Sequence, residues 1–221
     1  MKTTLFSLAA FFFLFTAVRA QSLDYGVKAG LNISSIGGDA NFGVDPNTVN
    51  GDQEASTSSR TTVHFGFFAQ YTLDEQWAFR PELIYSAQGG TLSYSGVFSG
   101  FTITTTSDIR LDYLQLPLLG VYTPLNGLQL QAGPQLGLLI NAEAETTLAG
   151  NGDSENSTED IKDSVNGFDF GVALGASYQL QATGFFFDAR YSLGLSNIND
   201  SEGDQSNQNN VFQLGVGYRF N

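Results

Sequence analysis

The end of the chain, residues 211–220, constrains the fold more than any other feature of the sequence. Apolar residues occupy every second position from Phe212 to Phe220, and small or polar residues lie between them. A period of two places the two sets on opposite faces of a β-strand. Because the same pattern recurs about eight times along the chain, we expect a β-barrel that this last strand closes.

The first 20 residues have the features of a secretory signal peptide. Lys2 supplies a positive start, residues 5–15 form an apolar run, and Val18-Arg19-Ala20 places small residues at the −3 and −1 positions. The sequence therefore predicts cleavage before Gln21, leaving residues 21–221 as one domain. The alternative is an uncleaved anchor, but a spanning helix needs about 20 apolar residues and this run is shorter.

Composition excludes several classes of protein. The chain has no cysteine, which excludes an N-terminal lipid-modified cysteine, disulfides and thiolate metal sites. The formal net charge is −13, and cleavage would remove Lys2 and Arg19 but no acid. A chain this acidic, without a basic patch, is not expected to bind nucleic acid. The expected mature chain has no long apolar run and no sustained helical periodicity, so we predict an all-β fold.

Strands are predicted wherever the alternation is sustained. Their ranges are 24–34, 62–73, 77–88, 109–122, 128–142, 167–180, 185–196 and 211–220. Within 109–122 the apolar residues change parity, because Ile109, Leu111 and Tyr113 are out of phase with Leu114 and Leu116. A bulge near Tyr113 would reconcile the two halves.

The connections between these strands alternate strictly in length. Long polar segments at 35–61, 89–108, 143–166 and 197–210 alternate with short ones at 74–76, 123–127 and 181–184. Such sorting is typical of an eight-stranded, antiparallel, up-and-down transmembrane barrel, with short periplasmic turns and long extracellular loops. Both termini would then lie in the periplasm. The second long segment has an alternation of its own, so we expect that hairpin to project beyond the membrane.

Aromatic residues gather near the predicted strand ends. They are Tyr25, Tyr71, Trp77, Tyr85, Tyr122, Phe168, Tyr178, Phe185 and Phe220. This placement is typical of the aromatic girdles at membrane interfaces. A secreted β-sandwich with aromatic residues capping its core is the alternative.

Four motifs resemble those of the PorT-like outer-membrane β-barrel proteins, often called the porin family. They are Tyr25-Gly26-Val27-Lys28-Ala29-Gly30-Leu31-Asn32, Arg80-Pro81-Glu82-Leu83-Ile84-Tyr85-Ser86, Tyr113-Leu114-Gln115-Leu116-Pro117-Leu118-Leu119 and Ala132-Gly133-Pro134-Gln135-Leu136-Gly137. The resemblance covers the whole mature chain and implies an outer-membrane location and an eight-stranded barrel. It implies little about activity, although the founding member serves a protein secretion machinery. Asn221 after Phe220 departs from the usual aromatic end of the signal that barrel-assembly machinery recognises.

Several charged residues are predicted to face the lumen, together with the only histidine. The set is Lys28, His64, Arg80, Glu82, Asp169, Asp188, Arg190 and Arg219. Charges removed from water must pair, so we expect a network of Arg80 with Glu82 and Asp188 with Arg190, which Lys28 and Arg219 join across the closing seam. A barrel of this size has room for side chains and little else, which favours a structural plug. An ion- or proton-conducting path is the alternative.

The sequence contains no arrangement that indicates catalysis. No Gly-x-Ser-x-Gly motif occurs, and His64 would have to serve any Ser/His mechanism. A lone histidine without a Cys/His cluster is not a metal site. We therefore predict no catalytic residue, no cofactor and no resident metal.

More than half of the 22 acidic residues fall in the long connections. Solvated loops explain this acidity, and weak binding of divalent cations is the alternative, although ordered EF-hand spacing is missing. The expected partners are outer-membrane lipid, the barrel-assembly machinery, which would bind the C-terminal strand, and a protein partner at the extracellular loops. The sequence thus favours a non-catalytic barrel with a structural, adhesive or complex-partner role. A narrow channel and an accessory part of a secretion system are the alternatives.

Overall fold

The computed structural model describes residues 22–38, 53–98, 101–150, 153–181, 183–199 and 207–220. The predicted signal peptide, residues 1–20, lies outside these ranges. The strands are β1 (Leu23–Gly38), β2 (Gln53–Thr72), β3 (Trp77–Phe98), β4 (Phe101–Leu125), β5 (Leu128–Gly150), β6 (Asp153–Asp160), β7 (Phe168–Gln179), β8 (Phe185–Gly194) and β9 (Asn207–Phe220). A short 3₁₀ turn, Lys162–Ser164, precedes β7. No helix among the described residues has the length and hydropathy of a membrane span.

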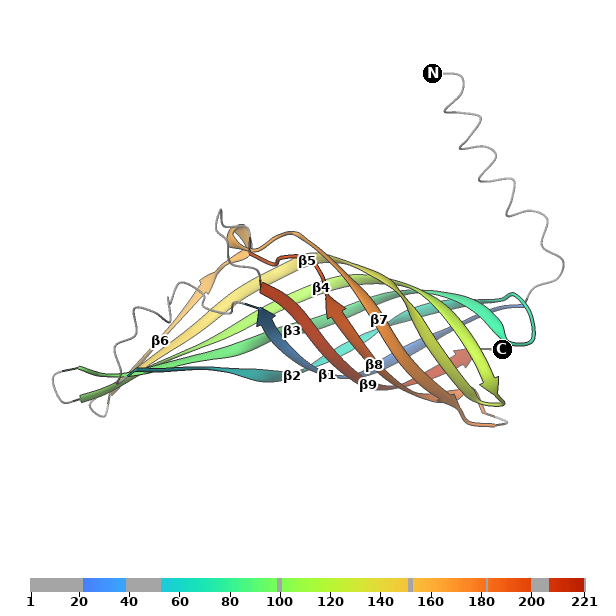
Figure 1. The fold of residues 1–221 in the computed structure, drawn as a ribbon, viewed down its shortest axis with the longest axis horizontal. Helices are drawn as coiled ribbons and strands as arrows, with labels where there is room; N and C mark the ends of the chain where they lie inside the picture. Colours follow the sequence, from blue (N-terminus) through green and yellow to red (C-terminus); the bar gives the residue numbers. More distant parts are fainter. Residues whose placement is uncertain are drawn as a thin grey trace, which may run out of the picture.

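Eight of these strands form a closed antiparallel ring (Figure 1). Each strand pairs with its neighbour along the chain, β5 pairs with β7, and β1 pairs with β9 to close the ring. The seam runs from Tyr25 opposite Phe220 to Gly38 opposite Asn207. The predicted eight-stranded up-and-down barrel is therefore confirmed, including the pairing of the last strand with the first.

Alternation along each strand separates an apolar outer face from a largely polar interior. In β1, Tyr25 and Leu31 point outward and are 60% and 54% exposed, whereas Lys28 and Asn32 point inward and are buried. A soluble protein would not leave so many large apolar side chains facing water. An apolar outer band around a polar interior is typical of a barrel whose outer face contacts the hydrocarbon of a membrane.

A register shift does lie beside Tyr113, where a bulge was predicted, but β4 itself keeps its alternation there, so the bulge is not in the strand for which it was predicted. Odd-numbered residues of β4 point inward from Ile109 to Val121, and Leu111 and Tyr113 are fully buried. The register shift lies in the partner strand, because Asp112 pairs with Asn141 while Tyr113 pairs with Leu139. The extra residue is in β5, where a bulge resets which side chains face the interior.

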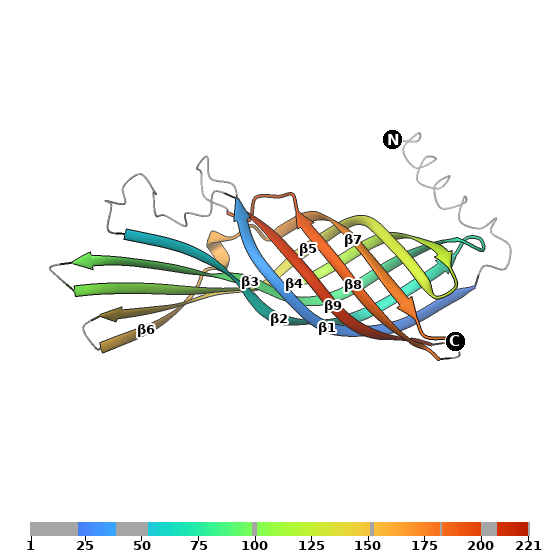
Figure 2. The same cartoon turned by 60° about the horizontal axis from the view of Figure 1, so that its bottom comes forward.

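Where the structure describes them, three of the long connections are folded mostly as strands rather than as loops. Beyond the ring, β2, β3, β4, β5 and β6 continue as a five-stranded antiparallel sheet (Figure 2). We call this part, residues 53–59, 90–98, 101–110, 143–150 and 153–160, the projecting sheet. The predicted hairpin is its centre, since β3 pairs with β4 as far as Phe98 opposite Phe101. Regular cross-strand pairing is why these Ser/Thr-rich segments are not simple loops.

The opposite end of the barrel carries the short turns and both ends of the described chain. Leu23 pairs with Tyr71 just before one turn, and Phe220 pairs with Tyr25 beside it. Gly127 completes another turn with a φ of 88°, which glycine adopts readily. We call this end the turn end, and the end with the projecting sheet the loop end.

Candidate functional site

Four charged side chains meet in the middle of the lumen. Arg190 Nη1 and Nη2 donate to Glu82 Oε2 and Oε1 at 2.7 and 2.9 Å, a bidentate pair. Lys28 Nζ forms an ion pair with Asp188 and lies 3.7 Å from Glu82 Oε2. All four side chains are at most 2% exposed. Two cations and two anions thus neutralise one another away from water, as buried charges require.

Glutamine supplies the remaining hydrogen bonds of this cluster. Gln131 Nε2 donates to Asp188 Oδ2 at 2.5 Å, and Arg190 Nη2 donates to Gln131 Oε1 at 2.8 Å. Sequence reasoning missed Gln131, although β5 carries glutamine at several inward positions, and that repetition was the available signal. A neutral amide can bridge both signs of charge without adding a charge of its own.

Arg80 lies nearer the turn end, and its expected pairing with Glu82 is wrong. Its guanidinium donates to Gln70 and Gln129. The same group lies 5.2 Å from the ring centre of Phe68 and 6.0 Å from that of Phe186. Cation–π contact therefore replaces the predicted carboxylate partner.

Phe68 and Phe186 fill the lumen below Arg80. Their ring centres are 5.5 Å apart in an edge-to-face arrangement. Gly26 and Gly217 make room for them, since an added Cβ would lie 2.5 Å from Phe68 Cζ and 2.2 Å from Phe186 Cζ. The two glycines and two rings form a complementary layer that narrows the turn end of the lumen.

Arg219 lies at the turn end, so it does not join the central charge network as predicted, whereas Lys28 does. Its Nη1 is 3.8 Å from Asp24 Oδ2, and its Nη2 is 3.4 Å from Gln129 Oε1. Asp24 was not among the predicted lumen residues. It is adjacent to Arg219 because the two lie on neighbouring strands across the seam.

His64 belongs to a neutral layer above the ion-pair cluster. Its Nδ1 is 2.8 Å from Asn32 Oδ1, which also accepts from Gln213 Nε2 at 3.0 Å. Its Nε2 has no hydrogen-bond partner among the described residues. Within the part of the chain that the structure describes, the side chain that hydrogen-bonds to the imidazole is therefore an amide, not a serine hydroxyl or a carboxylate.

Asp169 lies apart from the other predicted charges. It accepts a hydrogen bond from Ser196 Oγ at 2.5 Å, near the loop end of the barrel. Of the predicted lumen residues, the structure thus brings Lys28, Glu82, Asp188 and Arg190 into one cluster. His64, Arg80, Arg219 and Asp169 lie in separate layers.

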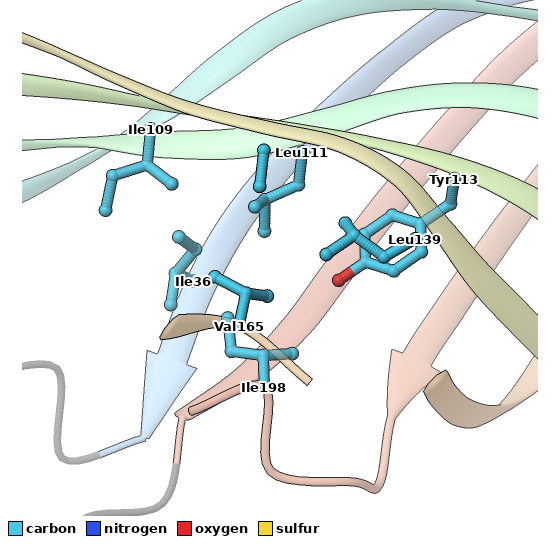
Figure 3. Close-up of a cluster of buried hydrophobic side chains, with 8 residues drawn as sticks. Ile36, Ile109, Leu111, Tyr113, Leu139, Val165 and Ile198 are labelled. Carbon is cyan, nitrogen blue, oxygen red and sulfur yellow. The ribbon is translucent and has the colours of Figure 1, made fainter. Parts of the chain in front are cut away.

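An apolar cluster fills the loop end of the lumen (Figure 3). Its members are Ile36, Ile109, Leu111, Tyr113, Leu139, Ala142, Val165 and Ile198. Most come from the barrel wall, but Val165 and Ile198 come from the connections before β7 and after β8. We call this cluster the apolar plug. The sequence indicated this cluster through the apolar residues Ile109, Leu111 and Tyr113 of β4. The sequence analysis instead attributed their change of phase to a bulge.

The layers together describe a filled lumen rather than a reaction centre. Going from the turn end, they are the aromatic pair, the ion-pair cluster, the amide layer with His64, and the apolar plug. No three His, Cys, Asp or Glu side chains in the described ranges are placed to hold a metal ion. Several acids of the long connections lie outside those ranges, so weak divalent-cation binding there stays a prediction.

A family of known proteins matches most of the chain. Residues 19–200 match the family of the outer membrane protein beta-barrel domain. Among solved structures, the attachment invasion locus protein Ail of Yersinia pestis, in complex with the heparin analogue sucrose octasulfate, is 14% identical over 90% of this chain and 99% of Ail, with a TM-score of 0.42. Neisserial surface protein A is 13% identical over 90% of this chain and 99% of its own, with a TM-score of 0.42. The outer membrane protein OprG from Pseudomonas aeruginosa is 17% identical over 90% of this chain and 97% of OprG, with a TM-score of 0.39. No curated protein matches the chain.

Proposed function

Because the chain belongs to the family of the outer membrane protein beta-barrel domain, we propose that it is a non-catalytic recognition protein of the cell outer membrane. Its role in this proposal is adhesive or that of a complex partner. The ring anchors the chain in the bilayer, and the projecting sheet presents its contact surface outside the cell. One observation carries the proposal: the barrel wall continues for many residues beyond the ring as an ordered sheet, while the lumen is filled.

The filled lumen weighs against the channel alternative. A permeant ion would have to displace the Arg190–Glu82 pair and then pass the apolar plug, where it would lose its hydration without gaining a polar partner. Conduction needs sites that bind an ion weakly enough to release it. Neither layer provides such a site.

The PorT-like resemblance suggests one form of the complex-partner role, an accessory component of a protein secretion system. We also propose that residues 1–20 are removed on export, and that the C-terminal strand is recognised by the barrel-assembly machinery. Support for the last point is the position of β9, which closes the ring and ends on Phe220.

Site-specific photo-crosslinking in native membranes tests the proposal. A photoreactive residue in place of Thr104, on the projecting sheet, is expected to form adducts with a partner. The same residue in place of Glu75, in a short turn, serves as the control and should give no adduct of that mass. No adduct from the sheet would contradict a recognition role. Discrete openings of the purified protein in a planar bilayer would favour the channel instead.

A further inference from the structure

A hollow at the far tip of the projecting sheet combines apolar side chains with carboxylates. Its volume is about 440 Å³, and its lining includes Phe101, Ile103, Leu148, Gly150, Asp153 and Glu155. We call it the tip hollow. Phe101 and Leu148 are 53% and 46% exposed, which is unusual for large apolar side chains beyond the membrane band.

Strand register explains the shape of the hollow. Ile103 pairs with Gly150, and Gly150 pairs with Asp153, so these three form one row across the sheet. In the next row Leu148 pairs with Glu155. Because Gly150 has no side chain, the surface drops between Ile103 and Leu148. Ile103 and Leu148 therefore form an apolar base of the hollow, and Asp153 and Glu155 line its β6 side.

The carboxylates on this side of the hollow have no counter-charge. All residues of β6 are exposed, and four of the eight are acidic: Asp153, Glu155, Glu159 and Asp160. No ion pair within the described ranges involves Asp153 or Glu155, and Arg110, which lies on the other face of the sheet, is paired with Glu145. The site is thus complementary to a ligand that is both apolar and positively charged.

The free edge of β6 indicates what kind of ligand this is. β6 is the last strand of the sheet, so one row of its backbone N–H and C=O groups has no strand partner among the residues that the structure describes. A peptide in extended conformation can satisfy that row, whereas a small cationic amphiphile cannot. A second copy of the chain is a poor match, because antiparallel pairing of two β6 strands would set Asp153 opposite Asp160.

We infer that the tip hollow binds an extended, basic peptide segment of a partner protein. The segment lies along β6, with an apolar side chain over Leu148 and lysine or arginine facing Asp153 and Glu155. This inference rests on the proposed recognition function and specifies the chemistry of the partner.

Peptide binding to the full chain in zwitterionic lipid nanodiscs tests the inference. The probe is a fluorescein-labelled peptide of Lys-Leu repeats, followed by anisotropy and corrected with empty nanodiscs. Leu148→Ser and the double variant Asp153→Asn/Glu155→Gln should each weaken binding about tenfold or more, given the contributions of a buried leucine and of two charge contacts. The matched control Glu75→Gln/Asp163→Asn removes the same charge elsewhere and should change the dissociation constant less than about twofold. Peptides of Glu-Leu or Lys-Ser repeats should bind at least about tenfold more weakly than the probe.

Three results would overturn the inference. They are unchanged binding by Leu148→Ser, equal weakening by the control variant, and equal binding of the Lys-Ser peptide. Equal weakening by the control would indicate general attraction to an acidic protein. If any of these occurred while Thr104 still formed its crosslink, the proposed function would stand and the peptide site would not. Loss of the crosslink would instead remove the proposed function.

Discussion

At the scale of single residues, the Arg190–Glu82 pair is the most demanding contact in the lumen. Arg190→Ala leaves Glu82 buried with only Lys28 near its carboxylate, and removing one partner of a buried pair typically costs about 3–5 kcal/mol. The double variant Arg190→Met/Glu82→Leu removes both charges but also leaves Lys28 and Asp188 as a neutral pair. We expect it to recover most of the lost stability. Urea unfolding in lipid vesicles, followed through the single tryptophan, Trp77, measures both effects. A double variant no more stable than Arg190→Ala would show that the pair adds net stability.

A conservative substitution at Tyr113 is expected to raise the free energy of unfolding rather than lower it. Its hydroxyl is buried in the apolar plug and has no hydrogen-bond partner among the described residues. Because an unpaired buried polar group costs about 1–3 kcal/mol, Tyr113→Phe should raise the free energy of unfolding by about 1 kcal/mol. Tyr113→Ala, which leaves a cavity, should lower it by about 3–5 kcal/mol. The same urea titration applies, and a destabilised Tyr113→Phe would indicate that the hydroxyl is hydrogen-bonded to water.

Individual lumen positions could be predicted from the sequence, but their partners could not. Period-two alternation is enough to place Arg80 and Glu82 on the inner face, and it does so here. Which groups meet across the lumen depends on the stagger of strands far apart in the chain, which alternation does not encode. Arg80 therefore meets Phe68 and Gln70 of the neighbouring strand and Gln129 of β5, and not the glutamate two residues along its own strand.

At the scale of elements, the junction between ring and projecting sheet depends on Gly89. This residue has a φ of 127°, and an added Cβ would lie 1.9 Å from the carbonyl oxygen of Ile109. The neighbouring register shift between Ser59 and His64 shows that β2 also adjusts here. A single residue thus allows β3 to leave the barrel wall while keeping its pairing with β4.

Gly89→Ala should accordingly destabilise the protein by about 1–3 kcal/mol, the usual cost of a side chain at a strained backbone position. Gly120→Ala is the matched control in β4, since its Cβ would be an ordinary 3.6 Å from the Ala132 carbonyl oxygen. Limited proteolysis in nanodiscs should cut the projecting sheet faster in Gly89→Ala than in Gly120→Ala. Equal rates for the two variants would mean that the junction tolerates a side chain.

The strands were more predictable than what lies between them. Alternation over the ring is strong because one face meets hydrocarbon and the other a polar lumen. Above the ring both faces of the sheet are half-exposed and rich in Ser and Thr, so alternation in 143–150 and 153–160 is weak and these segments looked like loops. Ile109 and Leu111 alternate clearly with polar residues, which is enough to place them on one face of a strand. Because the interior of a barrel is usually polar, this alternation alone did not predict an apolar layer inside the lumen.

At the scale of the whole molecule, the ring and the projecting sheet are held together by different sets of strand pairings. The pairings of β1 with β2 and β9, of β7 with β5 and β8, and of β8 with β9 involve no residue of β3 or β4. No member of the lumen layers described above falls within residues 92–107. In the proposed function, anchoring and recognition therefore fall on different parts of the chain, so the outer sheet can be shortened without touching the pairings that close the ring.

Replacing residues 92–107 by Asn-Gly tests this separation. Thr91 and Asp108 are cross-strand partners, so a two-residue turn of the hairpin type can join β3 to β4 directly above the ring. The shortened protein should still reach the outer membrane and migrate heat-modifiably on a gel, because the closed ring and its filled lumen persist. It should lose binding of the Lys-Leu peptide, because Phe101 and Ile103 are gone and the tip hollow with them. A shortened chain that no longer shows the heat-dependent shift would mean that the sheet is needed to close the barrel, and one that still binds the peptide would place the peptide site elsewhere.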